Sequence, residues 1–314
     1  MSASTLLHAC VWVAASMSVA CQSNNSAVTE NARSPAPSLA RRQAPARPEA
    51  RAPFGDFSVA YSDSGGAETA LVLVHGWAAD RRVWDEQIAP LSEAFRVLAV
   101  DLLGHGQSDT PALTYSVELL ADSLHAILQH AGVQRAVLVG HSNASAVVLA
   151  LQRRAPERVA GLVIVDGALQ ALALDQATLD GYLARYRGDE YLTHVERDGR
   201  QMFSPQLDPA RREDLLDMMR AVPQHVLVSS LAASFESAAW SDAPLATPLL
   251  VLRARSPFWT EASKAFAETL AAELEYHILD GVTHYLMLDE PHSFRHLLRD
   301  FVVRRALLES AGSS

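Results

Sequence analysis

Apolar residues along this chain fall into short continuous runs, and polar or amphipathic segments separate one run from the next. Short apolar runs with β-branched members are typical of buried strands. They predict strands at Phe57–Tyr61, Ala70–Val74, Arg96–Val100, Arg135–Val139, Val159–Val165, Leu249–Leu252 and Glu275–Leu279. Helical spacing predicts helices between them, at Arg82–Leu91, Ser116–His130, Ala144–Arg154, Ser263–Ala272 and Pro291–Leu308. This alternation indicates an α/β protein with a mainly parallel, doubly wound sheet.

The alternation stops between about residue 168 and residue 243. This interval contains amphipathic helical segments such as Gln176–Arg187 and Pro209–Arg220, and no strong strand run. It therefore predicts a helical insertion in the α/β framework.

The segment Gly140-His141-Ser142-Asn143-Ala144 lies where a predicted strand meets a predicted helix. A serine between small residues at such a turn has the pattern of a nucleophile elbow. Gly140 and Ala144 let the strand and the helix pass closely, and the helix N-terminus favours negative charge beside the serine oxygen. The segment indicates that Ser142 is a nucleophile, the alternative being a buried serine in an ordinary strand-to-helix turn.

Three further segments carry motifs in a recognisable order. His75-Gly76-Trp77 ends one apolar run, residues 101–109 (DLLGHGQSD) follow another, and His284 ends a glycine-containing turn after Leu279. With the elbow, they resemble the motifs of the α/β-hydrolases from about Phe54 to Leu308. The resemblance implies an α/β-hydrolase domain over residues 54–314. It also implies that the insertion at about 168–243 is a helical cap after strand six, above the active site.

The resemblance implies a site in which a serine, a base and an acid act together. Ser142 would be the nucleophile and His284 the base that takes its proton. The oxyanion hole would consist of the backbone N–H groups of Trp77 and Asn143. His75 and His105 match positions where the ring usually braces the turns.

The acid is the difficult member of this set. Many relatives place an aspartate after strand seven, but this chain has Leu252-Arg253-Ala254-Arg255-Ser256-Pro257-Phe258-Trp259-Thr260-Glu261 there. A known alternative in the family follows strand six, where Asp166 ends an apolar run and precedes a glycine. We therefore predict Asp166 as the acid, with Glu261 as the alternative acid and an absent acid as the third possibility.

The N-terminal segment has the composition of an export signal rather than of the fold. Leu6 to Ala20 is an apolar stretch too short for a comfortable membrane span, which predicts a signal peptide over residues 1–21. Ser18-Val19-Ala20-Cys21 resembles a lipobox, which predicts lipidation of Cys21 and a membrane-anchored lipoprotein. Without a lipid, the protein would be periplasmic or secreted. Residues 22–53 are rich in Ser, Ala, Pro and Arg, which predicts a disordered tether.

Composition narrows the class of partner. The chain has 314 residues, 49% of them hydrophobic, which suits one large α/β domain with an insertion. Its formal net charge of −10 argues against nucleic acid as a partner. Nothing in the sequence indicates a metal or an organic cofactor, and it carries no signal for an oligomeric state.

These patterns together predict a serine hydrolase that cleaves an ester or related acyl bond of a small molecule. Lactonase, peptidase, carbon–carbon bond hydrolase and cofactor-free haloperoxidase activities share the fold, and fold alone does not choose among them. A catalytically silent protein that binds a ligand under its cap is the alternative from another class. Tyr182, Tyr191, Phe203, Trp240, Phe258 and Trp259 are candidate pocket residues.

Overall fold

A computed structural model describes residues 49–172 and 174–308. Its framework is an eight-stranded sheet in the order β1-β2-β4-β3-β5-β6-β7-β8. The strands are β1 (Glu49–Phe54), β2 (Phe57–Asp63), β3 (Thr69–Val74), β4 (Val97–Val100), β5 (Arg135–His141), β6 (Val159–Val165), β7 (Leu249–Ala254) and β8 (Leu274–Leu279). The first two pairings, β1 with β2 and β2 with β4, are antiparallel. All the others are parallel, as the alternation of strands and helices predicts.

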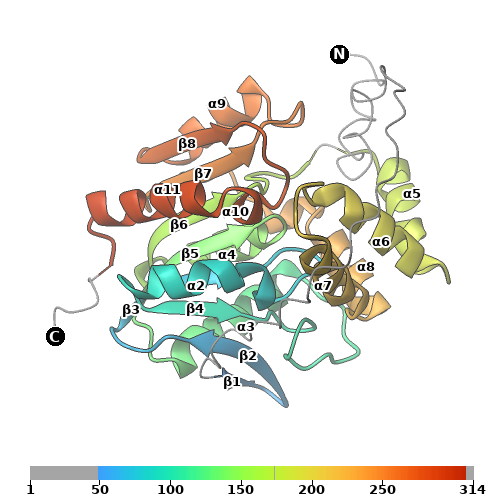
Figure 1. Cartoon of the computed structure of the whole chain (residues 1–314), viewed down its shortest axis with the longest axis horizontal. Coiled ribbons are helices and arrows are strands. Elements are labelled where there is room, and N and C mark those ends of the chain that lie inside the picture. Colours follow the sequence, from blue (N-terminus) through green and yellow to red (C-terminus); the bar gives the residue numbers. More distant parts are fainter. Residues whose placement is uncertain (1–48, 173, 309–314) are drawn as a thin grey trace, which may run out of the picture.

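Helices cover both faces of this sheet, which explains why the central strands are apolar throughout. The helix α2 (Asp85–Ser92) follows a short 3-10 turn, η2 (Arg81–Trp84), and packs beside α11 (Pro291–Arg304) on one face (Figure 1). On the other face α3 (Val117–His130) packs beside α4 (Ala144–Arg154). Every residue of β6 is buried between these layers.

The described part of the framework has three further short helical elements. They are α9 (Glu261–Leu270), α10 (Leu286–Asp289) and the 3-10 turn η3 (Pro156–Arg158). The helix α9 begins with a capping box, in which Thr260 and Ser263 each bond the backbone of the other.

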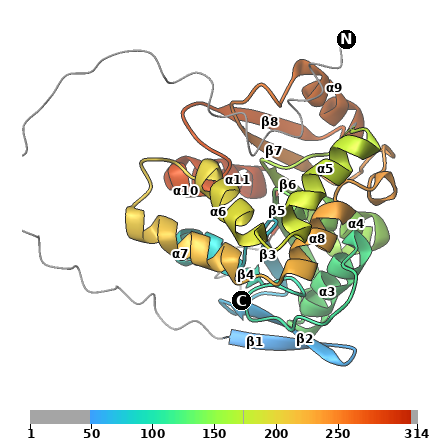
Figure 2. The same cartoon turned by 90° about the vertical axis from the view of Figure 1, so that its right-hand side faces the viewer.

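A helical cap lies at the end of the sheet toward which the parallel strands run (Figure 1). It consists of α5 (Gln176–Arg187), α6 (Tyr191–Met202), α7 (Pro209–Arg220), α8 (Gln224–Ala233) and the turn η4 (Ser237–Ala239). Figure 2 shows these helices in front of the ends of the strands. The insertion predicted after strand six is therefore present as a layer of helices, and α5 and α7 have the predicted bounds.

The predicted tether is wrong at its C-terminal end. Glu49–Phe54 is a strand that pairs along its whole length with β2. The Arg51 guanidinium binds the Asp109 carboxylate at 2.6 Å, and the side chain of Ala52 is buried. The strand β1 thus starts five residues before the predicted domain boundary at residue 54. The predicted signal peptide and the rest of the tether lie outside the described residues.

Among the residues that the structure describes, no helix is both long enough and apolar enough to cross a bilayer.

Candidate active site

Ser142 lies in a strained turn between β5 and α4. Its φ of +55° is in the left-handed region, which side-chain-bearing residues seldom adopt. The Ser142 amide donates a hydrogen bond of 2.9 Å to the carbonyl of Val165, so the turn is tied to the end of β6. The backbone is crowded here, since a Cβ at Gly167 would lie 2.4 Å from the Ser142 carbonyl oxygen. Ser142 thus lies in a strained, crowded turn between a strand and a helix, which is where the sequence pattern predicts a nucleophile.

Asp166 and His284 meet beside this turn. The Nδ1 atom of His284 donates a hydrogen bond of 2.8 Å to Oδ2 of Asp166, and both side chains are buried. Asp166 also has a positive φ, +47°, and its amide donates to the Leu252 carbonyl of β7. Strained backbone persists only where the surrounding structure holds it, and such residues cluster at functional sites. Ser142 and Asp166 are two of them, at the ends of neighbouring strands.

The other oxygen of Asp166 is occupied by donors from the segment after β7. Its Oδ1 accepts the Trp259 indole N–H at 2.8 Å and the Ala254 amide at 3.0 Å. The carboxylate is therefore fixed in one rotamer, with Oδ2 directed at His284. Sequence reasoning missed these contacts because β7 was expected to end at Leu252, whereas it continues to Ala254.

Glu261, the alternative acid, lies elsewhere. It is the exposed first residue of α9, directly after the Thr260 cap. Its position in the first turn suits the positive end of the helix dipole. The structure thus brings Asp166, and not Glu261, to His284.

The turn that carries His284 is held by two further side chains. His141 donates from Nε2 to the His284 carbonyl oxygen at 3.0 Å. Burial, and secondarily the neighbouring His284, lower the pKa of His141 well below its usual value, so the His141 ring is neutral. Asp289 accepts the Thr283 amide at 2.5 Å and the Thr283 hydroxyl at 2.6 Å. Both contacts fix the backbone on which the base is carried.

The loop after β3 contributes Trp77, whose amide is one of the two predicted oxyanion donors. Within the described ranges, no carbonyl accepts the amide of Trp77 or of Asn143. The Trp77 indole donates to the Leu227 carbonyl of α8 at 2.9 Å, so the loop is tied to the cap. The first part of the loop is braced by His75, whose Nε2 accepts the Leu102 amide at 3.1 Å.

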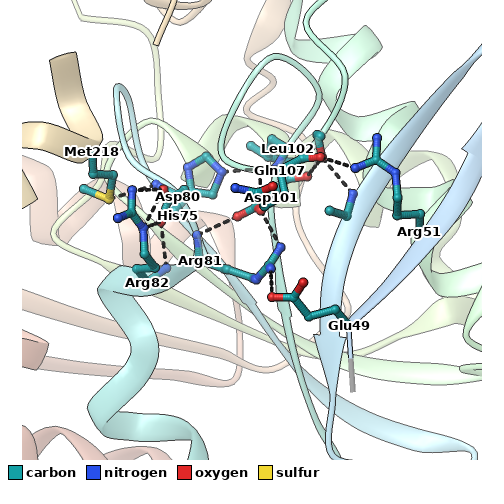
Figure 3. A network of polar contacts seen from close by, with 12 residues as sticks. Glu49, Arg51, His75, Asp80, Arg81, Arg82, Asp101, Leu102, Gln107 and Met218 are labelled. Carbon is teal, nitrogen blue, oxygen red and sulfur yellow. Dashed lines mark hydrogen bonds and ion pairs between the residues drawn. The ribbon is translucent and has the colours of Figure 1, made fainter. Parts of the chain in front are cut away.

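A polar network lies in and beside the same loop (Figure 3). The buried Asp101 binds the Arg81 guanidinium at 2.5 Å, and Arg81 also binds Glu49 of β1 at 2.6 Å. Beside it, Asp80 binds Arg82 at 2.7 Å. The Asp80 carboxylate also accepts the Arg82 backbone amide at 2.9 Å and so caps η2, just after the predicted oxyanion loop.

These groups open into one cavity of about 140 Å³ between the sheet and the cap. A cavity of about this size holds a small organic molecule. Ser142, Asn143, Asp166, His284 and Trp77 all line it. Most of the other lining residues are apolar or aromatic, and they include Leu172, Tyr182, Met202, Leu231, Phe235, Trp240, Phe258, Trp259 and Tyr285. Of the candidate pocket residues, Tyr191 and Phe203 do not line it, and Phe203 instead packs on Tyr285.

Comparison with known proteins shows which family the chain resembles. A family model for the alpha/beta hydrolase fold matches residues 69–291. The esterase RhEst1 from a Rhodococcus species has a TM-score of 0.70 at 26% identity, over 82% of this chain and 98% of that one. An esterase from Thermogutta terrifontis has a TM-score of 0.72 at 22% identity, over 83% and 99% of the two chains.

The sequence relatives are more distant or shorter matches. An uncharacterised protein of Mycobacterium tuberculosis is 36% identical over 101 residues, which is 32% of this chain and 30% of the relative. The AB hydrolase superfamily protein YisY of Bacillus subtilis is 24% identical over 196 residues, 59% of this chain and 73% of the relative. The match thus spans about a third of the first of these relatives.

Proposed function

The chain belongs to the alpha/beta hydrolase fold family, and we propose that within it this protein is a serine hydrolase that cleaves an ester or related acyl bond of a small molecule. The observation that carries the proposal is the hydrogen bond from His284 Nδ1 to Asp166 Oδ2, made in the cavity that Ser142 also lines. That bond fixes the imidazole tautomer with Nε2 free of its proton, which is the form a general base needs.

In the proposed reaction, Ser142 Oγ attacks the carbonyl carbon of the substrate and passes its proton to His284. The amides of Trp77 and Asn143 stabilise the oxyanion. His284 then returns the proton to the leaving alcohol, and an acyl-enzyme remains on Ser142. A water molecule hydrolyses this ester by the same steps, while Asp166 stabilises the transient imidazolium without taking a proton.

The lining of the cavity supports an uncharged substrate. None of the described residues that line it is a lysine or an arginine, and its carboxylate is already bound to His284. A charged acyl or alcohol group would therefore lose its hydration without gaining a partner. Neutral alkyl or aromatic esters fit the site best.

A panel of p-nitrophenyl esters, run beside lactones and peptides, tests this activity. We expect turnover of neutral esters and an initial burst of about one equivalent of p-nitrophenol, because acylation releases the phenol before deacylation limits the rate. Preferential turnover of a lactone, a peptide or a carbon–carbon bond would reassign the reaction. Absence of turnover and of any covalent adduct would favour the silent ligand-binding alternative.

We also propose that the protein is exported and anchored through lipid on Cys21. The apolar stretch and the lipobox-like segment before Cys21 support this. Native protein should partition into detergent, and Cys21→Ser should release or stall it. A soluble wild-type product that begins at or after Cys21 and lacks lipid mass would contradict the anchor.

A further inference from the structure

Arg253 is a fully buried cation at the end of β7. Its exposed fraction is 0%, although it follows four apolar strand residues and precedes the exposed Arg255. Burying a charge is costly unless a partner compensates it. Among the described residues no carboxylate forms an ion pair with Arg253, and its Nε atom has no hydrogen-bond partner. The Tyr276 ring lies beside it, with its centre 6.0 Å from the guanidinium carbon. Such a residue needs an explanation beyond packing.

The contacts of Arg253 lead to the candidate acid. Its Nη1 donates to the carbonyl of Gly167, the residue after Asp166. Its guanidinium carbon lies 3.6 Å from the centre of the Trp259 ring, in a cation–π contact. The same Trp259 donates its indole N–H to Asp166 Oδ1 at 2.8 Å. Arg253 is therefore joined to Asp166 along two short routes, one through the backbone and one through the indole.

The route through the indole has an electrostatic consequence. A cation over the ring face draws electron density from the ring, which makes the indole N–H a stronger donor. Asp166 Oδ1 is thus held by a donor that the buried cation polarises, and Oδ2 is left for His284. Burial lowers the pKa of Arg253, while the charge of Asp166 opposes that change, so cation and carboxylate affect each other without touching.

We propose that Arg253 and Trp259 are positioning residues, which hold the Asp166 carboxylate toward His284 and offset part of its negative charge. This rests on the function proposed above. The Asp166 charge favours the imidazolium form of His284, and the nearby Arg253 charge opposes it. Removing the Arg253 charge should therefore favour the imidazolium form of His284, which cannot accept the Ser142 proton.

The other groups around His284 do not supply that positive charge. The His141 ring lies 4.6 Å from the His284 ring and is neutral, as argued above. The Tyr285 ring lies 5.5 Å away, and burial raises the pKa of Tyr285, so it too is uncharged near neutral pH. Asp80, which faces Tyr285, is neutralised by Arg82, and Asp289 binds Thr283. Arg253 is then the buried cation whose contacts lead to the Asp166–His284 pair.

The test is the pH profile of kcat/KM with the best p-nitrophenyl ester. Arg253→Met removes the charge and should move the acid limb to higher pH by about half a unit or more. Arg253→Lys keeps the charge and should leave the limb near that of the wild type. Trp259→Phe keeps an aromatic face for Arg253 and removes the N–H. It should reduce kcat/KM about tenfold and move the limb in the same direction as Arg253→Met.

Arg255→Met is the matched control. Arg255 lies two residues farther along, is exposed and pairs with the exposed Asp280, so its removal should leave the limb in place. An acid limb that stays at the wild-type pH in both Arg253→Met and Trp259→Phe would overturn the proposal. So would a limb that moves equally in Arg253→Lys and Arg253→Met.

A second readout needs no activity. The NMR titration midpoint of the His284 ring should move upward in Arg253→Met and not in Arg255→Met. If wild-type protein hydrolyses no ester, the proposed function fails while this titration still tests the charge effect. If esters are hydrolysed and the midpoint does not move in Arg253→Met or in Trp259→Phe, the positioning role fails alone.

Discussion

Asp101 and Asp166 each follow directly after a buried strand, and each is almost completely buried, yet their partners differ. Asp101 binds the permanently charged guanidinium of Arg81 at 2.5 Å and also accepts the amides of Arg81 and Gln107. Asp166 accepts two uncharged N–H groups, from Trp259 and Ala254, and then His284.

The difference separates a structural carboxylate from one available for catalysis. Burial raises the pKa of Asp101, and Arg81 opposes that change, so the pair is a fixed brace between β1, η2 and the loop after β4 (Figure 3). Asp166 has a partner that can gain and lose a proton. Its charge is therefore available to stabilise an imidazolium that exists only during the reaction.

The largest effect is expected at the two groups that exchange the proton in the proposed reaction. Ser142→Ala and His284→Ala should each reduce kcat by about 10⁴- to 10⁶-fold. Because the residues act as a unit, the double variant should be little worse than either single one, as steady-state kinetics would measure. Additive losses would mean that the two side chains do not share a mechanism.

Asp166→Asn should reduce kcat by about 10⁴-fold, because the amide keeps the shape of the site but no longer favours the imidazolium or the correct tautomer. Circular dichroism and thermal unfolding should show that the fold is retained. Activity near that of the wild type would remove Asp166 from the catalytic set.

Two buried histidines, His105 and His141, belong with Asp101 on the structural side of this comparison, because each bonds to backbone groups. Burial lowers the pKa of His105 to about 3 and that of His141 well below its usual value. Below about pH 6.5 the unfolded chain binds protons on both rings and the folded chain does not, so stability falls as the pH falls. The free energy of unfolding should drop by about 2 kcal/mol between pH 6.5 and pH 5.5, as urea titrations would measure.

His105→Gln removes one of the two rings. It should therefore lower the slope of the unfolding free energy against pH by the contribution of one proton. A free energy of unfolding that is constant between about pH 6.5 and pH 5.5 would contradict the neutral state of these rings.

Asp101→Asn should affect stability rather than chemistry. It leaves the Arg81 guanidinium, itself largely buried, with only the exposed Glu49 carboxylate, at an expected cost of about 3 kcal/mol. Denaturant unfolding would measure this, and kcat of the folded enzyme should stay within about tenfold of the wild type. A loss of kcat as large as that of Asp166→Asn, in a protein that remains folded, would erase the distinction between the two carboxylates.

Glu261→Gln should have the smallest effect, less than about tenfold in kcat, because Glu261 only occupies the first turn of α9. Near-complete inactivation by this variant, together with an active Asp166→Asn, would move the acid to the segment after β7.

The apolar runs predicted the interior of the sheet, and β6 has the bounds expected from the sequence. The strand β1 was missed because Glu49-Ala50-Arg51-Ala52-Pro53 has little apolar area, and an edge strand tolerates proline. What holds β1 is its pairing with β2 and ion pairs to Arg81 and Asp109, which are distant in the sequence.

At the site, the turn motifs indicated Ser142 and His284, because the local backbone requires a glycine close to each. A Cβ at Gly140 would lie 2.9 Å from the Ala144 carbonyl oxygen, and Gly281 has a φ of +74°.

The choice between Asp166 and Glu261 depended on the path of the segment after β7. That path is set by contacts between residues distant in the sequence, so no local pattern predicts it. Arg253 was missed for a related reason, since a charged residue after an apolar run normally marks the end of a buried strand. The aromatic pair Phe258-Trp259 was the only signal of a partner for it.

The most direct test of the account is covalent labelling with a fluorophosphonate, followed by peptide mass spectrometry. We predict one adduct per chain, on Ser142, in wild-type protein and in Asp101→Asn. Labelling should be slowed by orders of magnitude in Asp166→Asn and absent in Ser142→Ala. An adduct on another residue, or equal labelling rates in the Asp166 and Asp101 variants, would contradict the claim that Asp166 and His284 activate Ser142.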